Sequence, residues 1–240
     1  MPLPDAFVEH LREFGYHPRS DRHSNALAEA IIHDFLQSCE RVRQQAKLGE
    51  LVYALNMDTK VRTSTWNVDL VLGVPPSAAP PSDGVIARAT PSAVRVAIEI
   101  KTVMTEHRKA VKNRKRDFEA HHEHVHNYSR RAVAAGVLVV NASTEFRSPL
   151  RTAPTTHGSR QAVNRLVEHC ITEMRNVAES GGSSSYGMDA KTVITLDFDN
   201  VHLDQARFTT ALPAPQPGDP LHYDSFIRKL CDEYCDRFPS

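Results

Sequence analysis

The sequence predicts an α/β fold in which a mixed central sheet is flanked by helices. Short, apolar, β-branched runs over 94–102 and 136–141 are typical of buried strands. A long helical pattern over 105–134 separates these runs, and a strand–helix–strand unit is nearly always a right-handed parallel crossover. The proline-rich stretch 75–84 ends the preceding strand, and we expect it to join two antiparallel strands.

The remaining elements follow from the same patterns. Leu27, Ile31, Phe35 and Val42 form the apolar stripe of a helix expected from Ser24 to about Lys47. The other predicted elements are helices over 5–14, 159–178 and 223–238 and strands over 51–55, 61–74 and 191–198. We expect residues 1–142 to form the core, and residues 143–240 to be an extension that completes the fold and serves recognition or dimerisation.

The composition is that of an ordinary globular protein, with 40% hydrophobic and 24% charged residues. No apolar run approaches the ~20 residues of a membrane span, and no signal-peptide pattern opens the chain, so we expect no membrane partner. Cys39, Cys170, Cys231 and Cys235 are scattered, which argues against a disulfide framework or a zinc site and favours the reducing cytoplasm. The absence of Gly-rich phosphate-loop, GxSxG and HExxH motifs argues against P-loop NTPases, α/β-hydrolases and common zinc proteases.

Asp69, Glu99 and Lys101 lie near the ends of two apolar runs, 66–73 and 94–101. On a strand, Glu99 and Lys101 point to the same face, and burying them is costly unless they are paired or bind a metal. Two carboxylates beside an ammonium group can hold Mg²⁺, with the carbonyl of Ile100 as a further ligand. Such a group could hydrolyse a phosphodiester bond. Lys101 would then orient or deprotonate the attacking water, or stabilise the phosphate. A lowered pKa of Lys101 would suit its role as the base that deprotonates the water.

These residues favour a site for phosphodiester hydrolysis, but one alternative stays open. The alternation of the run places 94, 96, 98 and 100 on one face and 95, 97, 99 and 101 on the other. An exposed amphipathic strand with a solvent-facing ion pair shows the same alternation.

The three residues resemble the signature of the PD-(D/E)xK nuclease superfamily. That signature is an acid on one strand, acid-x-Lys on the next strand, and a helix that crosses to a third strand. Asp69 matches the first acid, and Glu99 and Lys101 match the acid-x-Lys pair, over about residues 24–142. The resemblance implies a restriction endonuclease-like core and a glutamate on the preceding helix that reaches the metal site, for which Glu29 is the candidate.

The resemblance also implies a function. It points to a Mg²⁺-dependent DNA endonuclease of the type II restriction or phage-defence kind, in which Mn²⁺ would substitute for Mg²⁺. We expect a homodimer, because cutting both strands of a duplex takes two sites and two-fold symmetry matches a palindromic target. Two alternatives remain: a nuclease effector subunit of a defence complex without sequence preference, and a catalytically inactive nucleic-acid-binding module.

Basic residues gather in two places although the net charge is zero. The segment 107–116 holds six Lys or Arg residues and no acid, and this pattern predicts contact with DNA phosphates. The alternative is that these residues form a solvated helix face. The loop 147–160 follows the third strand, and its arginines are candidates for base or phosphate contacts. The predicted nucleic-acid-binding residues are Arg108, Lys109, Lys112, Arg114, Lys115, Arg116, Arg147, Arg151 and Arg160.

Four histidines follow this basic segment: His121, His122, His124 and His126. His122 and His126 have the spacing of a zinc pair on a helix, but no third ligand is evident, so we expect a surface-exposed helical segment. Trp66 is the only tryptophan and is expected to pack in the core.

Overall fold

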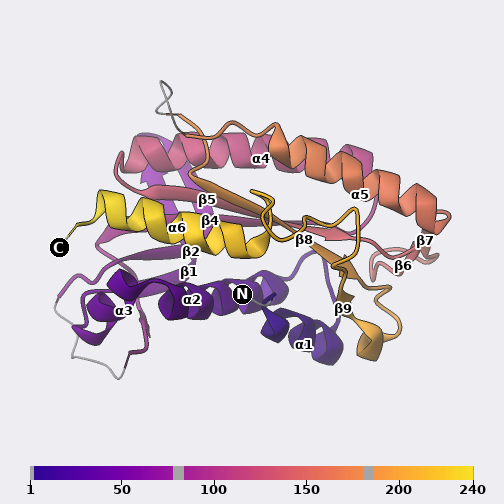
Figure 1. Ribbon diagram of the computed structural model, residues 1–240, viewed down its shortest axis with the longest axis horizontal. Helices are drawn as coiled ribbons and strands as arrows, with labels where there is room; N and C mark the ends of the chain where they lie inside the picture. Colours follow the sequence, from indigo (N-terminus) through magenta and orange to yellow (C-terminus); the bar gives the residue numbers. More distant parts are fainter. Residues whose placement is uncertain (1–2, 78–83, 181–185, 240) are drawn as a thin grey trace.

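The computed structural model describes residues 3–77, 84–180 and 186–239, which form three layers (Figure 1). A seven-stranded mixed sheet lies between helices on both of its faces, which confirms the predicted α/β class. The helices among these residues are α1 (Asp5–Phe14), α2 (Arg22–Ser38), α3 (Glu40–Lys47), α4 (His107–Tyr128), α5 (Arg160–Arg175) and α6 (Tyr223–Arg237). The strands of the sheet are β1 (Val52–Val61), β2 (Ser64–Val74), β3 (Ala87–Arg88), β4 (Ala93–Val103), β5 (Val133–Asn141), β8 (Ala190–Asp197) and β9 (Arg207–Phe208).

The strand order is β3-β1-β2-β4-β5-β8-β9, and β6 (Glu145–Phe146) pairs separately with β7 (Thr155–Thr156). β1, β2 and β4 are antiparallel neighbours, whereas β4, β5 and β8 run parallel. Helix α4 makes the predicted crossover from β4 to β5. Every residue of β5 is buried, as expected for a central parallel strand covered on both faces.

The central strands contribute to two cores on opposite faces of the sheet. On β4, Ile98 and Ile100 pack in the core that includes residues of α1, α2 and α6. Ala97 and Val103 pack in the core that includes residues of α4 and α5. Figure 1 shows α4 and α5 together above the sheet and α1, α2 and α3 below it. A strand alternates its side chains, so Glu99 lies on the α4 side with Ala97.

Strand β4 departs from regular alternation near its start. Its register with β2 shifts between Val96 and Val94, so Arg95 is an extra residue in the ladder. The Arg95 guanidinium donates to Gln45 Oε1 and to the Tyr234 hydroxyl, each at 2.9 Å, while Val94 packs in the core on the α4 side. The predicted grouping of positions 94 and 96 on one face is therefore wrong.

Several predicted elements have different bounds in the structure, among them the strand expected over 51–55, which is β1 and runs to Val61. The helix expected over 24–47 is two helices, because Cys39 between them is extended, with φ −110° and ψ 103°. The strand expected over 61–74 begins at Ser64, after a two-residue turn in which Arg62 has φ 54°. The helix expected over 105–134 ends at Tyr128. Of the proline-rich connection, 78–83 lie outside the described residues, but β2 and β4 are antiparallel as predicted.

Three of the four cysteines lie close together in space. Cys39 forms a disulfide with Cys231 of α6, 192 residues further along the chain. The sequence argued against a disulfide framework and did not predict this single bond. Helix α6 packs against α2, which brings the two residues together, and spacing along the chain carries no signal of that packing.

The described residues after position 142 contribute to the same sheet and core as the residues before them. Strand β8 pairs with β5, and residues of α6 pack in the core that includes α2. A role of this range in recognition or dimerisation stays a prediction. Among the described residues, no helix combines the length and the apolar character that a membrane crossing requires.

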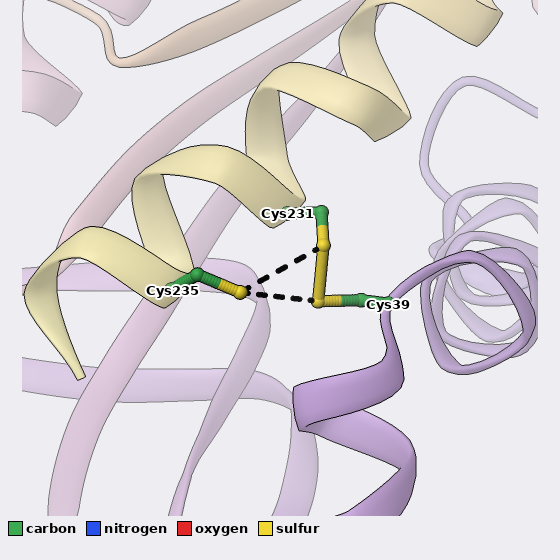
Figure 2. A group of neighbouring side chains, drawn as sticks. All are labelled: Cys39, Cys231 and Cys235. Atoms are coloured by element: carbon green, nitrogen blue, oxygen red, sulfur yellow. Dashed lines mark hydrogen bonds between the residues drawn. A yellow bond between two sulfur atoms is a disulfide. The ribbon is translucent and has the colours of Figure 1, made fainter. Parts of the chain in front are cut away.

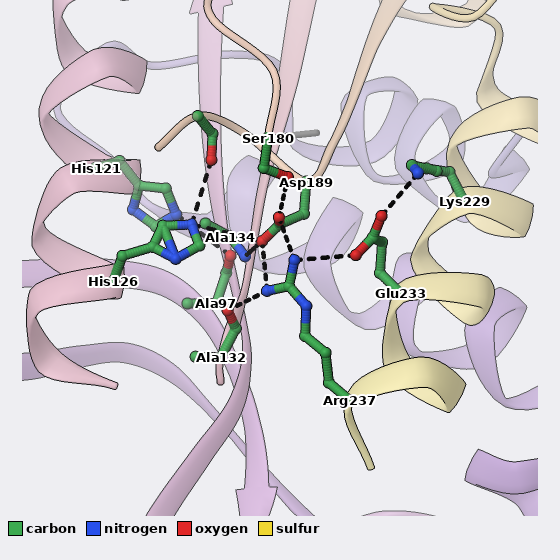
Figure 3. A network of polar contacts seen from close by, with 11 residues as sticks. Ala97, His121, His126, Ala132, Ala134, Ser180, Asp189, Lys229, Glu233 and Arg237 are labelled. Carbon is green, nitrogen blue, oxygen red and sulfur yellow. Dashed lines mark hydrogen bonds and ion pairs between the residues drawn. The ribbon is translucent and has the colours of Figure 1, made fainter. Parts of the chain in front are cut away.

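A buried ion pair attaches the end of α6 to the sheet (Figure 3). Arg237 contacts both carboxylate oxygens of Asp189, with Nη1 to Oδ2 at 2.9 Å, and the Asp189 side chain is 0% exposed. The same Oδ2 accepts from the backbone N–H of Ala134 at 2.7 Å, so the pair joins α6 to the starts of β5 and β8. Glu233 also contacts Arg237, at 2.9 Å.

Candidate active site

Asp69 lies where β2 and β4 separate. The pairing of the two strands ends at Leu70 and Ile98. Beyond that point, Asp69 Oδ2 accepts a hydrogen bond from the backbone N–H of Ile100 at 2.7 Å. A side-chain carboxylate therefore satisfies a strand donor that pairing with β2 leaves free. The structure brings Ile100 to the acid through its N–H, and a metal-ligand role of its carbonyl stays a prediction.

Glu99 is the most deeply buried acid of the site, at 2% exposure. Its Oε1 contacts Lys101 Nζ, and its Oε2 accepts from Trp66 Nε1 at 3.3 Å. Burial raises the pKa of Glu99, and the nearby Lys101 ammonium opposes that rise. The solvent-facing ion pair that the sequence left open is excluded by this burial.

Lys101 bridges the two acids. Its Nζ lies 3.5 Å from Asp69 Oδ2 and also contacts Glu99 Oε1. Burial alone would lower the pKa of Lys101, but the carboxylates of Glu99 and Asp69 outweigh it and hold the pKa above its usual value. Burial also raises the pKa of Asp69, together with repulsion from Glu99. With these neighbours and without a metal the pKa of Lys101 is therefore raised, and the lowered pKa considered for a base role beside a metal stays a prediction.

His121 belongs to the site, although the sequence predicted it on a surface-exposed helical segment. Its Nε2 donates to the carbonyl of Ala97 at 3.2 Å, and burial lowers its pKa to about 3, so the ring is neutral with a lone pair on Nδ1. That Nδ1 lies 3.5 Å from Glu99 Oε2 and has no hydrogen-bond partner among the described residues. A proton or a cation between this lone pair and the Glu99 carboxylate would be stabilised by both groups.

The histidine segment is buried, so the expectation of a surface-exposed helix segment is wrong. His121, His122, His124 and His126 are each at most 9% exposed. His124 Nε2 pairs with the Thr59 hydroxyl at 2.9 Å, and His126 Nε2 donates to a backbone carbonyl of residue 187 at 3.2 Å. These histidines lie on buried parts of α4, where His121, His124 and His126 each bind a polar group.

Trp66 also differs from its prediction. It is half-buried rather than fully buried, and its indole N–H binds Glu99. It lines a cavity of about 500 Å³ between the β1–β2 turn and α4, together with Arg62 and His124. The residue next to Lys101, Thr102, lines a second cavity of about 340 Å³ with Lys109 and others.

Glu29, implied by the resemblance as a third acid, does not join the site. It lies on α2, whose apolar residues pack on the other face of the sheet from Glu99. Its side chain is 49% exposed and lies 3.7 Å from the guanidinium of Arg88 on β3. Glu29 does not reach the site because α2 covers the face of the sheet opposite to the one on which Glu99 and Lys101 lie.

The basic residues of α4 divide into two groups. Arg114 pairs with Asp117 at 2.8 Å, and Lys115 pairs with Glu173 of α5 at 3.7 Å. The remaining four are exposed and form no ion pair within the part of the chain that the structure describes; they are Arg108, Lys109, Lys112 and Arg116. Asp117 also acts on the site, because its charge contributes to the raised pKa values of Glu99 and Lys101.

The predicted loop arginines are partly neutralised. Arg151 pairs with Glu106 at 3.0 Å. Arg160 lies 3.6 Å from Asp197 and donates to the carbonyl of Ala142 at 2.5 Å. Arg147 is exposed, and it makes no ion pair with any described residue.

Comparison with protein-family models, with curated proteins and with solved structures finds no match. The family resemblance therefore rests on the residues of this chain, and the geometry of the site carries any functional argument.

The donor set of the site suits a hard divalent cation. Asp69 and Glu99 offer carboxylate oxygens, which Mg²⁺ prefers, and no cysteine lies among the residues that contact them in the described structure. With both acids ionised, the single charge of Lys101 leaves the group net negative in a mostly buried position. The raised pKa values of both acids indicate that another positive charge would stabilise their ionised forms.

Proposed function

We propose that this chain is a Mg²⁺-dependent nuclease that hydrolyses phosphodiester bonds of DNA. The observation that supports it most is the convergence of Asp69, Glu99 and Lys101. They come from two neighbouring strands, and the Lys101 ammonium contacts both carboxylates. Buried acids with raised pKa values beside a fixed cation are typical of functional sites.

In the proposed site, Asp69 and Glu99 hold the metal. A bound Mg²⁺ would supply Lewis-acid stabilisation of the phosphate and of the leaving oxygen. The hydrogen bond from the Ile100 N–H fixes one oxygen of Asp69, so this carboxylate is preorganised. Trp66 donates a hydrogen bond to the other oxygen of Glu99 and limits its rotation.

Lys101 acts in this proposal as a charge. Its ammonium contacts both carboxylates and can stabilise the extra negative charge that develops on the phosphate during attack by water. The unpaired cations of α4 would contact the DNA backbone beside the site. Lys109 and Thr102 line one cavity beside the end of β4.

A restriction-type or phage-defence role, in the cytoplasm and as a homodimer, is part of the same proposal. Discrete fragments from plasmid DNA would support sequence-specific cutting. A smear would instead favour an effector without sequence preference.

The test is cleavage of supercoiled plasmid with Mg²⁺ and with Mn²⁺, in parallel with Mn²⁺ binding by calorimetry. We expect Lys101→Met and Glu99→Gln to reduce the cleavage rate by about 10²–10³-fold, the usual loss when one charge-stabilising group is removed. Asp69→Asn should remove the heat of Mn²⁺ binding. The matched control is Glu40→Gln, whose side chain is 65% exposed on α3 and which should cut normally. Cleavage that persists in all three site variants would refute the proposal, and metal binding without any cleavage would favour an inactive nucleic-acid-binding module.

A further inference from the structure

Three of the four cysteines meet on the face of the sheet opposite to the candidate active site. Cys39 lies between α2 and α3, and Cys231 and Cys235 lie one turn apart on α6 (Figure 2). Cys235 Sγ is 3.9 Å from Cys39 Sγ and 4.0 Å from Cys231 Sγ. All three sulfurs lie within 4.8 Å of one another, so the third cysteine is part of one cluster with the disulfide.

The position of Cys235 does not suit thiol–disulfide exchange. A thiolate attacks one sulfur of a disulfide while the other leaves on the far side, so the three sulfurs must stand nearly in line. Cys235 is almost equally far from both bonded sulfurs and therefore faces the middle of the bond, as Figure 2 shows. The three side chains instead converge on a common point.

We propose that, when the Cys39–Cys231 bond is reduced, Cys39, Cys231 and Cys235 bind Zn²⁺ as three thiolate ligands. Zinc–sulfur bonds of about 2.3 Å in tetrahedral geometry place thiolates about 3.8 Å apart. Two of the three sulfur–sulfur separations already match this value. The third is closed by the disulfide and opens when the bond is cleaved.

Two balanced steps form the site. A dithiol reductant gives two electrons and two protons to the Cys39–Cys231 disulfide and becomes a disulfide itself. Zn²⁺ then displaces three protons from the three thiols, and the complex carries a single negative charge. The disulfide is in this view the oxidised, metal-free form of the same cluster.

The surroundings fit a three-ligand site with an open position. Cys39 is 0% exposed and fixed at a helix junction, whereas Cys231 and Cys235 are partly exposed. Within the described part of the chain, no histidine or carboxylate joins these three sulfurs, so water would complete the tetrahedron. Like the disulfide, the ion would join α6 to the junction of α2 and α3. This inference does not depend on the nuclease proposal, because the two sites share no residue.

Cobalt(II) is the probe, because it occupies zinc sites and its thiolate complexes absorb light. The full chain is reduced with a phosphine, freed of reductant without oxygen, and titrated with Co²⁺ and then with Zn²⁺. We expect sulfur-to-cobalt charge-transfer absorption that saturates at one ion per chain and is lost when an equal amount of Zn²⁺ is added. Cys235→Ser should weaken Zn²⁺ binding more than about 100-fold, since even hydrogen-bond partners of metal ligands contribute about 10–100-fold.

The matched control is Cys170→Ala, because Cys170 is buried in the core on the other face and should not affect binding. Cys235→Ser leaves the disulfide intact, and far-UV circular dichroism checks that the variant folds. The proposal is overturned if the reduced wild-type protein shows no thiolate absorption with Co²⁺. It is also overturned if Cys235→Ser binds Zn²⁺ as tightly as the wild type, or if mass spectrometry finds Cys235 in a disulfide after mild reduction.

Discussion

His107 at the start of α4 should make the protein sensitive to acid. The residue is 2% exposed, and its Nε2 donates to the carbonyl of Asn141 at 2.7 Å. Its Nδ1 has no hydrogen-bond partner among the described residues, and the ring packs edge-on against His157 with centroids 4.7 Å apart. A second proton on this ring would therefore be buried without an acceptor.

The size of the effect follows from the pKa of this histidine. Burial is the main cause that lowers the pKa of His107 from 6.5 to about 4 in the folded protein. Between these two pH values the His107 ring binds a proton more readily in the unfolded chain than in the folded protein. Its contribution to the free energy of unfolding is therefore present above pH 6.5 and is lost as the pH falls toward 4. A shift of this size corresponds to about 3 kcal/mol in total, of which about 2 kcal/mol is lost between pH 7 and pH 5.

The assay is urea unfolding of the wild type and of His107→Gln at pH 7 and pH 5. Glutamine retains a donor for the Asn141 carbonyl but does not titrate, so its stability should fall about 2 kcal/mol less than that of the wild type over this range. Titration of all other groups is common to both proteins and cancels in the comparison. The control is His33→Gln, whose parent side chain is 68% exposed and which should follow the wild type. If His107→Gln loses as much stability as the wild type between the two pH values, the reasoning about this buried ring is wrong.

Two further predictions concern charged side chains. Asp189→Asn should reduce the free energy of unfolding by about 3–5 kcal/mol, because it leaves the Arg237 guanidinium without its buried carboxylate. The control Glu40→Gln, at an exposed ion pair, should cost well under about 1 kcal/mol. Urea unfolding measures both variants, and equal losses would contradict the structural role of the buried pair. If α4 contacts DNA, replacing Lys112 and Arg116 by alanine should weaken DNA binding. The slope of log affinity against log salt concentration should then decrease in magnitude by about 2. Fluorescence anisotropy in Ca²⁺ measures this slope, and an unchanged slope would exclude this face of α4 as the DNA contact.

Much of the fold could be predicted because the relevant signals are local. The predicted helix over 5–14 coincides with α1, and the predicted strand over 191–198 differs from β8 by one residue at each end. The errors lie where the signal is weak. The hairpin between β1 and β2 turns at Arg62 without a glycine, and the break between α2 and α3 falls at Cys39, which is no strong helix breaker.

The candidate site could be predicted in part. Asp69, Glu99 and Lys101 were found because strand alternation and the two-residue spacing place the last two on one face, and the structure brings all three into contact. Glu29 was misplaced, because which face of the sheet a helix covers is not written in its own periodicity. His121 was missed for the same reason: its ring reaches Glu99 only through the docking of α4.

The sequence by itself determined the α/β class, the crossover from β4 through α4 to β5, and the acid-x-Lys pair, since these depend on side-chain periods within a few residues. Only the tertiary structure decided that Cys39 meets Cys231 and Cys235, that the histidines of α4 are buried, and which of its cations are left unpaired. These outcomes depend on how helices rotate and dock against a sheet. That docking is set by the packing of residues far apart in the chain, which no local pattern encodes.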